Sequence, residues 1–493
     1  STGAIQGIAT NGSATIAGAT ALTVENAITA DGTVSLSAVN GVTLSGTNGD
    51  VTTNGGTFTV DADSNNDGTG TYSQDDVGSA VTTSNGTVSI TAGDVSLTGT
   101  IDAGTGTALI APSTAVSIGL GGAAGTFTLT DAAADQISGT RLEIGTSTSG
   151  AIRIDDFSPT NFTTLVLATD EDVAQGTVDA GTDLAIANLA IDSDTGVDID
   201  ANVTTLAINN ADVGSNVQID SSATSLTIGS VTTSAGALAG ITTAGGSVNV
   251  EGATAITVDN PLTSNGGDVV LTTTTGDLTV NAGVSASTGD IQINAADLVL
   301  TGALSSSGTL LLQPSTTGST IGIGGGSGAF DVDDAELALL TDGFASITIG
   351  DATDGSGAIE VDSSTFSDDV TIIGGPITVS GSLNVTGTTT LIAGGAVTIN
   401  ADVASSDSAN ITAADIAAAG QDVDIAAAVT VQSTGGSITI AAGDDFSMAA
   451  GSVLNASTTI TVNIDSGDAD NGTGATADLG GTFNSGVGAT VNS

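Results

Sequence analysis

The sequence of 493 residues contains no cysteine, no histidine and no lysine. Without cysteine there are no disulfides, and without cysteine and histidine the common zinc and copper sites are excluded. No stretch of about 18 apolar residues occurs, so no membrane-spanning helix is predicted. Aromatic side chains make up 2% of the chain, with Tyr72 as the single tyrosine and no tryptophan. Any core must therefore be built mainly from aliphatic and small side chains.

Positive charge is almost absent as well. Arg141 and Arg153 stand against 54 acidic residues, which gives a formal net charge of -52. Such a field repels nucleic acid and anionic membranes, and it attracts Ca²⁺, Mg²⁺ and basic partners. Most of the acids are aspartate, which favours turns over helices. Two interpretations stay open: the charge keeps a long particle soluble, or the acidic turns bind cations.

What the chain has in abundance is a short alternating pattern of apolar and polar residues. Val34-Ser35-Leu36, Val88-Ser89-Ile90 and Ile291-Gln292-Ile293 are examples, each bounded by Gly, Asn or Asp nearby. Alternation with period two places both apolar side chains on one face of a strand. At 39%, the hydrophobic content is too high for a disordered acidic tail. The sequence therefore predicts an all-β fold of short strands.

Long internal repeats organise these strands. Residues 81–101 align with 284–304, a shift of 203 (284 minus 81), and residues 32–70 align with 436–474, a shift of 404 (436 minus 32). Near residue 18 the first shift is 234 (252 minus 18), so the first copy carries an insertion relative to the second. We expect super-repeat copies at about 18–251, 252–421 and 422–493, the last one partial, within one continuous solenoid spanning residues 1–493.

A parallel β-helix with about 20 residues per coil fits this pattern better than a string of β-sandwich domains. Sandwiches need longer strands, aromatic cores and a shorter repeat, whereas a β-helix stacks Val, Ile, Leu and Ala of successive coils on one another. Residues 331–341 and 410–420 are the two candidates for short helices, with Asp333 or Asp334 as the N-cap of the former. Both segments can instead be ordinary strands of a coil.

Two blocks carry a resemblance to a known family. Residues 308–350 (GTLLLQPSTTGSTIGIGGGSGAFDVDDAELALLTDGFASITIG) with 354–361 (DGSGAIEV), and more loosely residues 107–145, resemble repeats of giant secreted bacterial proteins of the filamentous-haemagglutinin kind. The resemblance implies a right-handed parallel β-helix, export across an outer membrane, and roles in adhesion, fibre formation or extracellular matrix. It carries over no catalytic residue.

One segment has the spacing of a calcium loop. Residues 61–70 read DADSNNDGTG, so that Asp63, Asn65 and Asp67 with the following glycine match the D-x-N-x-D-G opening of an EF-hand loop. Position twelve of such a loop would be Gln74, followed by two aspartates. In the third copy the aligned segment keeps acids at shifted positions. The candidate metal ligands are Asp61, Asp63, Asn65, Asp67, Asp465, Asp468 and Asp470, with Ca²⁺ as the ion; a plain polar turn is the alternative.

Catalysis is not expected. Paired acids such as Asp155-Asp156 and Asp333-Asp334 could in principle act as general acid and base on a polysaccharide. Polysaccharide-cleaving β-helices also use histidine or several basic residues, which this chain lacks. We therefore interpret the acid pairs as solvated turn residues. Arg153 is expected to pair locally, beside Asp155 and Asp156.

These observations predict a non-enzymatic structural protein that is secreted and acts outside the cell or on its surface. Its coils would build a fibre, sheath or biofilm matrix, with head-to-tail or lateral self-association and adhesion to glycans or to a host or neighbouring cell surface. Nucleic acid binding and membrane insertion are not expected. The alternatives are a cation-dependent surface layer and a polysaccharide-acting β-helix hydrolase.

Overall fold

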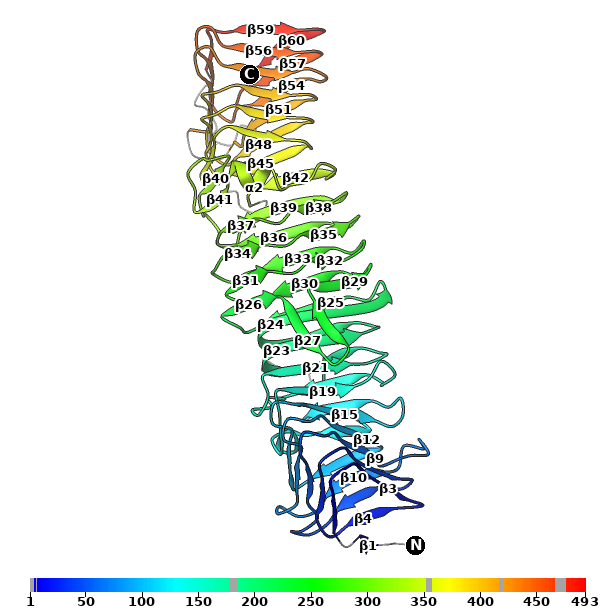
Figure 1. The fold of residues 1–493 in the computed structure, drawn as a ribbon. Coiled ribbons are helices and arrows are strands. Elements are labelled where there is room, and N and C mark those ends of the chain that lie inside the picture. Colours follow the sequence, from blue (N-terminus) through cyan, green and yellow to red (C-terminus); the bar gives the residue numbers. More distant parts are fainter. Residues whose placement is uncertain (1–3, 6, 177–183, 352–356, 416–419, 466–475) are drawn as a thin grey trace. The chain divides into compact units, whose positions relative to one another are not determined.

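The computed structural model describes residues 4–5, 7–176, 184–351, 357–415, 420–465 and 476–493. The chain divides into two compact units, Ser1–Gly252 and Ala253–Ser493. Each unit is all-β, as predicted, and its strands form long parallel sheets that stack in sequence order (Figure 1). This arrangement is consistent with a parallel β-helix. A single continuous β-helix over residues 1–493 stays a prediction.

Three parallel sheets, here called A, B and C, make up most of the first unit. Sheet A contains β1 (Ala4–Ile5), β4 (Leu22–Val24), β7 (Val42–Leu44), β10 (Thr71–Gln74) and β13 (Asp94–Leu97). Sheet B contains β2 (Ile8–Thr10), β5 (Ile28–Ala30), β8 (Val51–Thr53), β11 (Ala80–Thr82), β14 (Thr100–Asp102) and β18 (Ile137–Ser138). Sheet C begins with β3 (Ala14–Gly18), β6 (Val34–Ala38), β9 (Phe58–Asp61), β12 (Val88–Ala92), β15 (Thr107–Pro112), β19 (Arg141–Gly145), β21 (Thr164–Ala168), β23 (Leu184–Ser193) and β24 (Val197–Val213).

The rest of the first unit joins sheet C through the long strand β24. One branch contains β17 (Phe127–Leu129), β16 (Ile118–Gly121), β20 (Ile152–Asp155), β22 (Val173–Gln175), β25 (Val217–Ser221) and β30 (Val248–Glu251). Another contains β26 (Ser225–Ile228) and β29 (Ile241–Ala244). An antiparallel hairpin, β27 (Ser230–Thr233) and β28 (Gly236–Ala239), stands apart from these parallel sheets.

The second unit repeats this plan with sheets D, E and F. Sheet D contains β41 (Phe330–Val332), β40 (Ile321–Ile323), β43 (Ile359–Val361), β46 (Ile377–Val379), β49 (Val397–Ile399), β52 (Val423–Ile425), β55 (Phe446–Met448) and β58 (Ala477–Leu479). Sheet E contains β44 (Ser364–Phe366), β47 (Leu383–Val385), β50 (Val403–Ser405), β53 (Thr430–Ser433), β56 (Val453–Ala456) and β59 (Thr482–Ser485).

Sheet F is the longest ladder of the second unit. It contains β33 (Val269–Thr272), β36 (Ile291–Ala295), β39 (Thr309–Pro314), β42 (Ser346–Ile349), β45 (Val370–Gly374), β48 (Thr389–Ala393), β51 (Ala409–Ala413), β54 (Ile438–Ala441), β57 (Thr459–Asn463) and β60 (Gly488–Asn492). Two short ladders precede sheets D and E: β31 (Ala255–Val258), β34 (Leu278–Val280) and β37 (Leu298–Leu300), and β32 (Leu262–Thr263), β35 (Val284–Ser287) and β38 (Leu304–Ser306).

The register between paired strands shows how long each coil is. Ala14 pairs with Val34, which is close to the predicted coil length. The coil is shorter where Leu189 pairs with Leu206. It is much longer where Leu310 pairs with Ile347 in the second unit. The ladders therefore keep their pairing while the turns between them absorb insertions.

The core consists of aliphatic side chains stacked strand on strand. In β6, Val34, Leu36 and Ala38 are buried, while the serines between them are half-buried on the outer side. This confirms the period-two prediction for that segment. Val34 lies in register with Phe58 of the next coil, and both are fully buried. Each such aliphatic side chain contributes about 1.5–3 kcal/mol by leaving water. Phe58 also contacts Tyr72, with ring centroids 6.4 Å apart.

Two of the blocks that align in the sequence repeat fold alike in the two units. Ile118 and Ile321, which are equivalent in that alignment, begin β16 and β40, and each strand is followed by one short helix. These helices are α1 (Asp131–Ala134) and α2 (Asp334–Leu337). The predicted N-cap Asp333 is confirmed, and its carboxylate and Glu336 form a reciprocal capping box. No helix in the described part of the chain has the length and apolar content needed to cross a bilayer.

Each of these blocks also contains a strand that is stacked out of sequence order. Strand β17 pairs with β16 after a very short return of the chain, with Ile118 opposite Phe127, and lies against the earlier strand β13. The Thr128 amide donates to Asp94 on β13 at 3.1 Å, and in the second unit the Asp331 amide donates to Asp297 at 2.8 Å. We call β17 and β41 the back-folded strands.

Glycine makes the back-folded strands possible, because the chain returns within van der Waals contact of itself. A Cβ atom on Gly119 would lie 2.3 Å from the Ala123 carbonyl oxygen. The equivalent Gly322 would meet the Gly326 carbonyl oxygen at the same 2.3 Å. The other proposed helical segment, 410–420, starts inside β51 and is therefore a strand at its beginning. Its residues 416–419 lie outside the described part of the chain.

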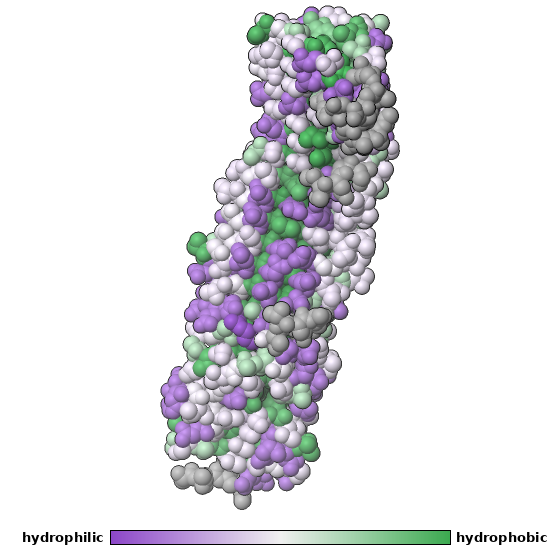
Figure 2. Space-filling view, turned by 180° about the vertical axis from the view of Figure 1, so that it is seen from behind, coloured by the Kyte–Doolittle hydropathy of each residue, from purple (hydrophilic) through white to green (hydrophobic). Residues whose placement is uncertain are grey.

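Aspartates at the turns connect successive coils. The Asp50 carboxylate accepts the Ala80 amide N–H of the neighbouring coil at 2.9 Å. Other aspartates that accept a backbone N–H from a different coil are Asp75, Asp94, Asp131, Asp135, Asp268, Asp290, Asp297, Asp368, Asp369, Asp402, Asp422, Asp444 and Asp445. A short carboxylate is well suited to bind main-chain donors beside it. Hydrophilic and weakly polar residues cover most of the face drawn in Figure 2.

Candidate functional site

The predicted calcium loop, residues 62–70, connects β9 to β10 in the first unit. We call it the Asp63 loop. Its turn is closed by the Asn66 amide, which donates to the Asp63 carbonyl oxygen at 2.8 Å. Asn66 and Gly68 have φ values of 53° and 81°, in the left-handed region. A Cβ atom on Gly70 would lie 2.0 Å from the Ala62 carbonyl oxygen, so the two ends of the loop are in close contact.

Asp63 is the centre of this loop and is fully buried. Its Oδ2 accepts the Gly68 amide N–H at 2.7 Å and the Ser113 hydroxyl at 2.5 Å. Ser113 follows β15, which lies two coils after β9 in sheet C. The Asp63 carboxylate therefore links the first and the last of three successive coils. The other oxygen, Oδ1, is buried and has no hydrogen-bond partner. A buried carboxylate oxygen without a partner is costly unless a proton or a cation meets it.

Asp67 lies on the exposed side of the same turn. Its carboxylate accepts the Thr69 hydroxyl at 2.5 Å, the Thr69 amide at 3.1 Å and the Asn65 side-chain amide at 2.7 Å. These donors, with the Thr69 hydroxyl first and Asn65 next, lower the pKa of Asp67. The structure therefore brings Asp63, Asn65 and Asp67 together.

The remaining predicted ligands lie elsewhere or have no described position. Asp61 ends β9, and its Oδ1 is buried without a hydrogen-bond partner. Gln74 is fully buried in β10, where its amide donates to the Thr100 carbonyl at 3.3 Å, so it does not close the loop as an EF-hand glutamate would. Asp465 is described, with a φ of 53°. Asp468 and Asp470 lie outside the described residues.

The carboxylates of this loop do not form a conventional metal cluster. Among the residues that the structure describes, no three His, Cys, Asp or Glu side chains are grouped so that they could hold a metal ion. A cation at the Asp63 loop would need neutral oxygens from amide, hydroxyl or carbonyl groups beside its carboxylates. Ca²⁺ accepts such mixed oxygen ligands, with six to eight in its coordination sphere.

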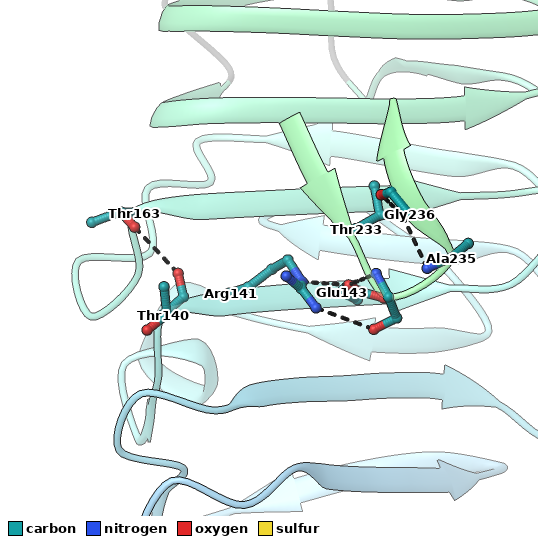
Figure 3. Close-up of polar contacts among 8 residues, drawn as sticks. Thr140, Arg141, Glu143, Thr163, Thr233, Ala235 and Gly236 are labelled. Carbon is teal, nitrogen blue, oxygen red and sulfur yellow. Dashed lines mark hydrogen bonds and ion pairs between the residues drawn. The ribbon is translucent and has the colours of Figure 1, made fainter. Parts of the chain in front are cut away.

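Arg141 takes part in the second notable polar group, on the outer face of sheet C. Its Nε donates to Glu143 at 2.5 Å, and Glu143 also accepts the Ser234 amide at 2.7 Å from the tip of the β27–β28 hairpin. The Arg141 guanidinium further donates to the Ser234 hydroxyl at 3.3 Å. Figure 3 shows the hairpin tip lying over Arg141 and Glu143 of β19. We call this group the arginine clamp.

The hairpin covers apolar side chains that point outward from the sheet. Val166, Ala190 and Ala207 are in register on successive strands, next to Glu143, and all three are buried. Val231 of the hairpin is 3% exposed and packs on them, together with Leu238. Glu143 points outward from the sheet between Leu142 and Ile144, yet it is buried because the hairpin covers that side. The only sequence signal for this hairpin is the glycine-containing turn between the two short strands at residues 230–239.

Arg153 pairs differently from the prediction. Its guanidinium contacts Asp172 at 3.0 Å, instead of its sequence neighbours Asp155 and Asp156. Arg153 is in register with Ala174, so Asp172 is its neighbour in the next coil. The side chains of this pair are 34% and 32% exposed, which makes it a weak surface pair.

Two carboxyls of the second repeated block have raised pKa values. Burial, followed by the charges of Asp297 and Asp333, raises the pKa of Asp331. Burial also raises the pKa of Glu336, whose carboxylate accepts the Leu300 and Asp333 amides at 2.9 and 3.0 Å. Glu336 thus satisfies an N–H of strand β37.

Comparison with models of known protein families, with curated proteins and with solved structures gave no match for this chain.

Proposed function

We propose that this chain is a segment of a non-enzymatic, extracellular structural protein. In this proposal it is a right-handed parallel β-helix with about 20 residues per basic coil, whose coils build a surface fibre, sheath or matrix. The observation that supports it is the uninterrupted parallel pairing within each unit. In sheet F, every strand from β33 to β60 is paired with the strand of the next coil.

The proposed mechanism is mechanical. Backbone ladders resist separation of successive coils, and the interior is closed by aliphatic stacks. The aspartate contacts between coils add about 1 kcal/mol each at partly buried positions, by analogy with helix caps. Because many carboxylates already accept backbone N–H groups, we favour a structural over a catalytic role for them. The high negative charge keeps such a surface hydrated and opposes lateral aggregation at low salt.

Self-association is the partner interaction that we propose, through the coil edge at β60. Val491 is 40% exposed, although it is in register with Val462, which is fully buried. Leu479 on β58 is 44% exposed in the same way. A coil of a second copy stacked on this edge would bury both side chains and extend the parallel pairing beyond β60. Adhesion to glycans or to neighbouring cell surfaces would then be distributed along the assembly.

Electron microscopy and light scattering of the chain 1–493 at physiological salt test this proposal. Val491→Lys should abolish assembly, because it places a charge at an inward position of the edge strand. Thr490→Lys is the matched control, since Thr490 is in register with the outward Thr461. Filaments formed by the parent chain and by Thr490→Lys only would support the proposal. Monomers under all conditions would refute the self-association.

A hydrolase is the competing class. Incubation with acidic and neutral polysaccharides, followed by a reducing-end assay, separates the two functions. Glycan binding without release of reducing ends supports a structural or adhesive role. Turnover that is lost when acids are replaced would overturn it.

A further inference from the structure

We propose that the Asp63 loop binds one divalent, oxygen-preferring cation such as Ca²⁺, with Asp63 and Asp67 as its carboxylate ligands. The proposal does not depend on the fibre function, because the site is complete within one coil stack of the first unit. The spacing in the sequence indicates these residues, and the contacts described below identify the oxygen atoms involved.

The first observation is the buried orphan oxygen of Asp63. Its Oδ2 has two donors, from Gly68 and Ser113, whereas Oδ1 has none although the residue is 0% exposed. The Oδ1 atom of Asp61, two residues earlier, is also buried and without a hydrogen-bond partner. A bound cation would compensate these atoms.

The second observation is the lack of a protein cation for this carboxylate. The chain has only two basic residues. Arg141 pairs with Glu143 and Arg153 pairs with Asp172, both away from this loop. An unpaired buried carboxylate is unfavourable, so a cation from solution is the natural counter-charge in a protein of net charge -52.

The third observation is the arrangement of the neighbouring oxygens. Asp63 and Asp67 are held on one turn, because the Gly68 amide donates to Asp63 Oδ2 and the Thr69 amide donates to Asp67 Oδ1. Asn65 donates its amide N–H to Asp67, which orients the rest of that amide within the turn. Two carboxylates with amide, hydroxyl and main-chain oxygens make a low-charge site, of the kind that binds Ca²⁺ weakly to moderately.

Tyr72 provides a reporter for this one site. It is the single tyrosine of a chain without tryptophan, and it lies on β10, the strand that the loop enters. Tb³⁺ replaces Ca²⁺ in oxygen sites and emits when a nearby tyrosine is excited. Metal-free protein titrated with Tb³⁺ should therefore give saturable emission from one class of site, and Ca²⁺ should displace it. Ions on turns far from Tyr72 contribute little emission, and the Asp63→Asn variant separates the loop from the acids beside the ends of β10, which are Asp75, Asp76 and Asp94.

Asp63→Asn is the decisive variant. Asparagine keeps an acceptor for Gly68 and Ser113 but removes the charge, so Tb³⁺ and Ca²⁺ affinity should fall about tenfold or more. Asp102→Asn is the matched control, because Asp102 is an exposed turn acid of the same unit that accepts the Gly104 amide at 2.8 Å. The Tb³⁺ and Ca²⁺ affinities of the Asp102→Asn variant should match those of the parent chain. Tyr72→Phe should lose the emission while calorimetry still detects binding.

The outcomes are distinct. Equal affinity of Asp63→Asn and the parent chain, or the absence of saturable binding by both emission and calorimetry, overturns the proposal. If Asp63→Asn does not fold, as judged by circular dichroism, the exposed Asp67→Asn makes the same comparison, again with an expected loss of about tenfold. All measurements use dilute, unassembled protein, so failure of filament formation does not affect them.

Discussion

Replacing Arg141 with methionine should release the β27–β28 hairpin while the rest of the first unit stays folded. The substitution removes the cation 2.5 Å from the Glu143 carboxylate and leaves that acid, whose side chain is 11% exposed, with the Ser234 amide. Loss of one partner from a fully buried pair costs about 3–5 kcal/mol. The Arg141 side chain is 19% exposed, so we discount this to about 2–3 kcal/mol. The hairpin is otherwise held mainly by Val231, worth about 1.5–3 kcal/mol.

The free energy lost with Arg141 is similar to the free energy that Val231 contributes to holding the hairpin on the sheet. We therefore expect the hairpin to separate locally from the sheet. Hydrogen exchange measured by mass spectrometry on a peptide covering 230–239 should accelerate about 30- to 150-fold, since about 1.4 kcal/mol corresponds to a factor of ten. Arg153→Met is the control; its pair with Asp172 is about one-third exposed and should contribute about 0.5 kcal/mol or less. Adding Glu143→Gln to Arg141→Met should restore part of the protection. Unchanged exchange in 230–239, or loss of protection across the whole unit, would refute the reasoning.

Three further predictions concern the core, the turns and the pH dependence. Phe127→Ala and Phe330→Ala remove equivalent, fully buried rings from the back-folded strands; each should cost about 3–5 kcal/mol in urea unfolding of its own unit, and a cost below about 1 kcal/mol would contradict the packing. Asp50→Ala should destabilise the first unit by about 1 kcal/mol and Asp50→Asn by less, because asparagine keeps the acceptor; equal effects would contradict the capping role. The pKa of Asp331 is raised above its ordinary 3.8 in the folded protein. Proton uptake by Asp331 therefore favours the folded state, and stability falls as the pH rises from about this ordinary value through the raised pKa. Asp331→Thr, which installs the residue of the equivalent position in the first unit, should reduce this fall in pH-dependent thermal melts, and Thr128→Asp should introduce one there; identical profiles would contradict the assignment.

Local patterns in the sequence predict much of the fold. Period-two alternation places Val34, Leu36 and Ala38 inward in β6, as observed. The internal repeat correctly predicts that the distant blocks around Ile118 and Ile321 fold alike, because the apolar positions and the turn glycines are kept together. The Asp333 cap follows from the preference of aspartate for the N-terminus of a helix.

Contacts between coils could not be predicted in the same way. The length of chain between paired strands varies widely, from the short coil at Leu189 to the long one at Leu310, so spacing does not reveal which turn lies beside which. Arg153 therefore finds Asp172 instead of its sequence neighbours, and Glu143 is covered by a hairpin that comes much later in the chain. At the candidate site, Asp63, Asn65 and Asp67 lie on one turn, and their role as metal ligands stays a prediction. The Ser113 contact comes from another coil and has no sequence signal.

The back-folded strands have a consequence for how such a chain reaches its native pairing. Strands that share one alternating pattern can in principle pair one coil out of step at small cost, because each misplaced strand meets a similar neighbour. Strand β17 fits only between β13 and β16, and β41 only between β37 and β40, since their pairing needs the short return of the chain and its glycines. A slipped stack would leave Phe127 or Phe330 without its pocket. Each unit thus contains one irregular strand, β17 or β41, that distinguishes the native strand pairing from a pairing shifted by one coil. We expect this strand to favour the native pairing during folding.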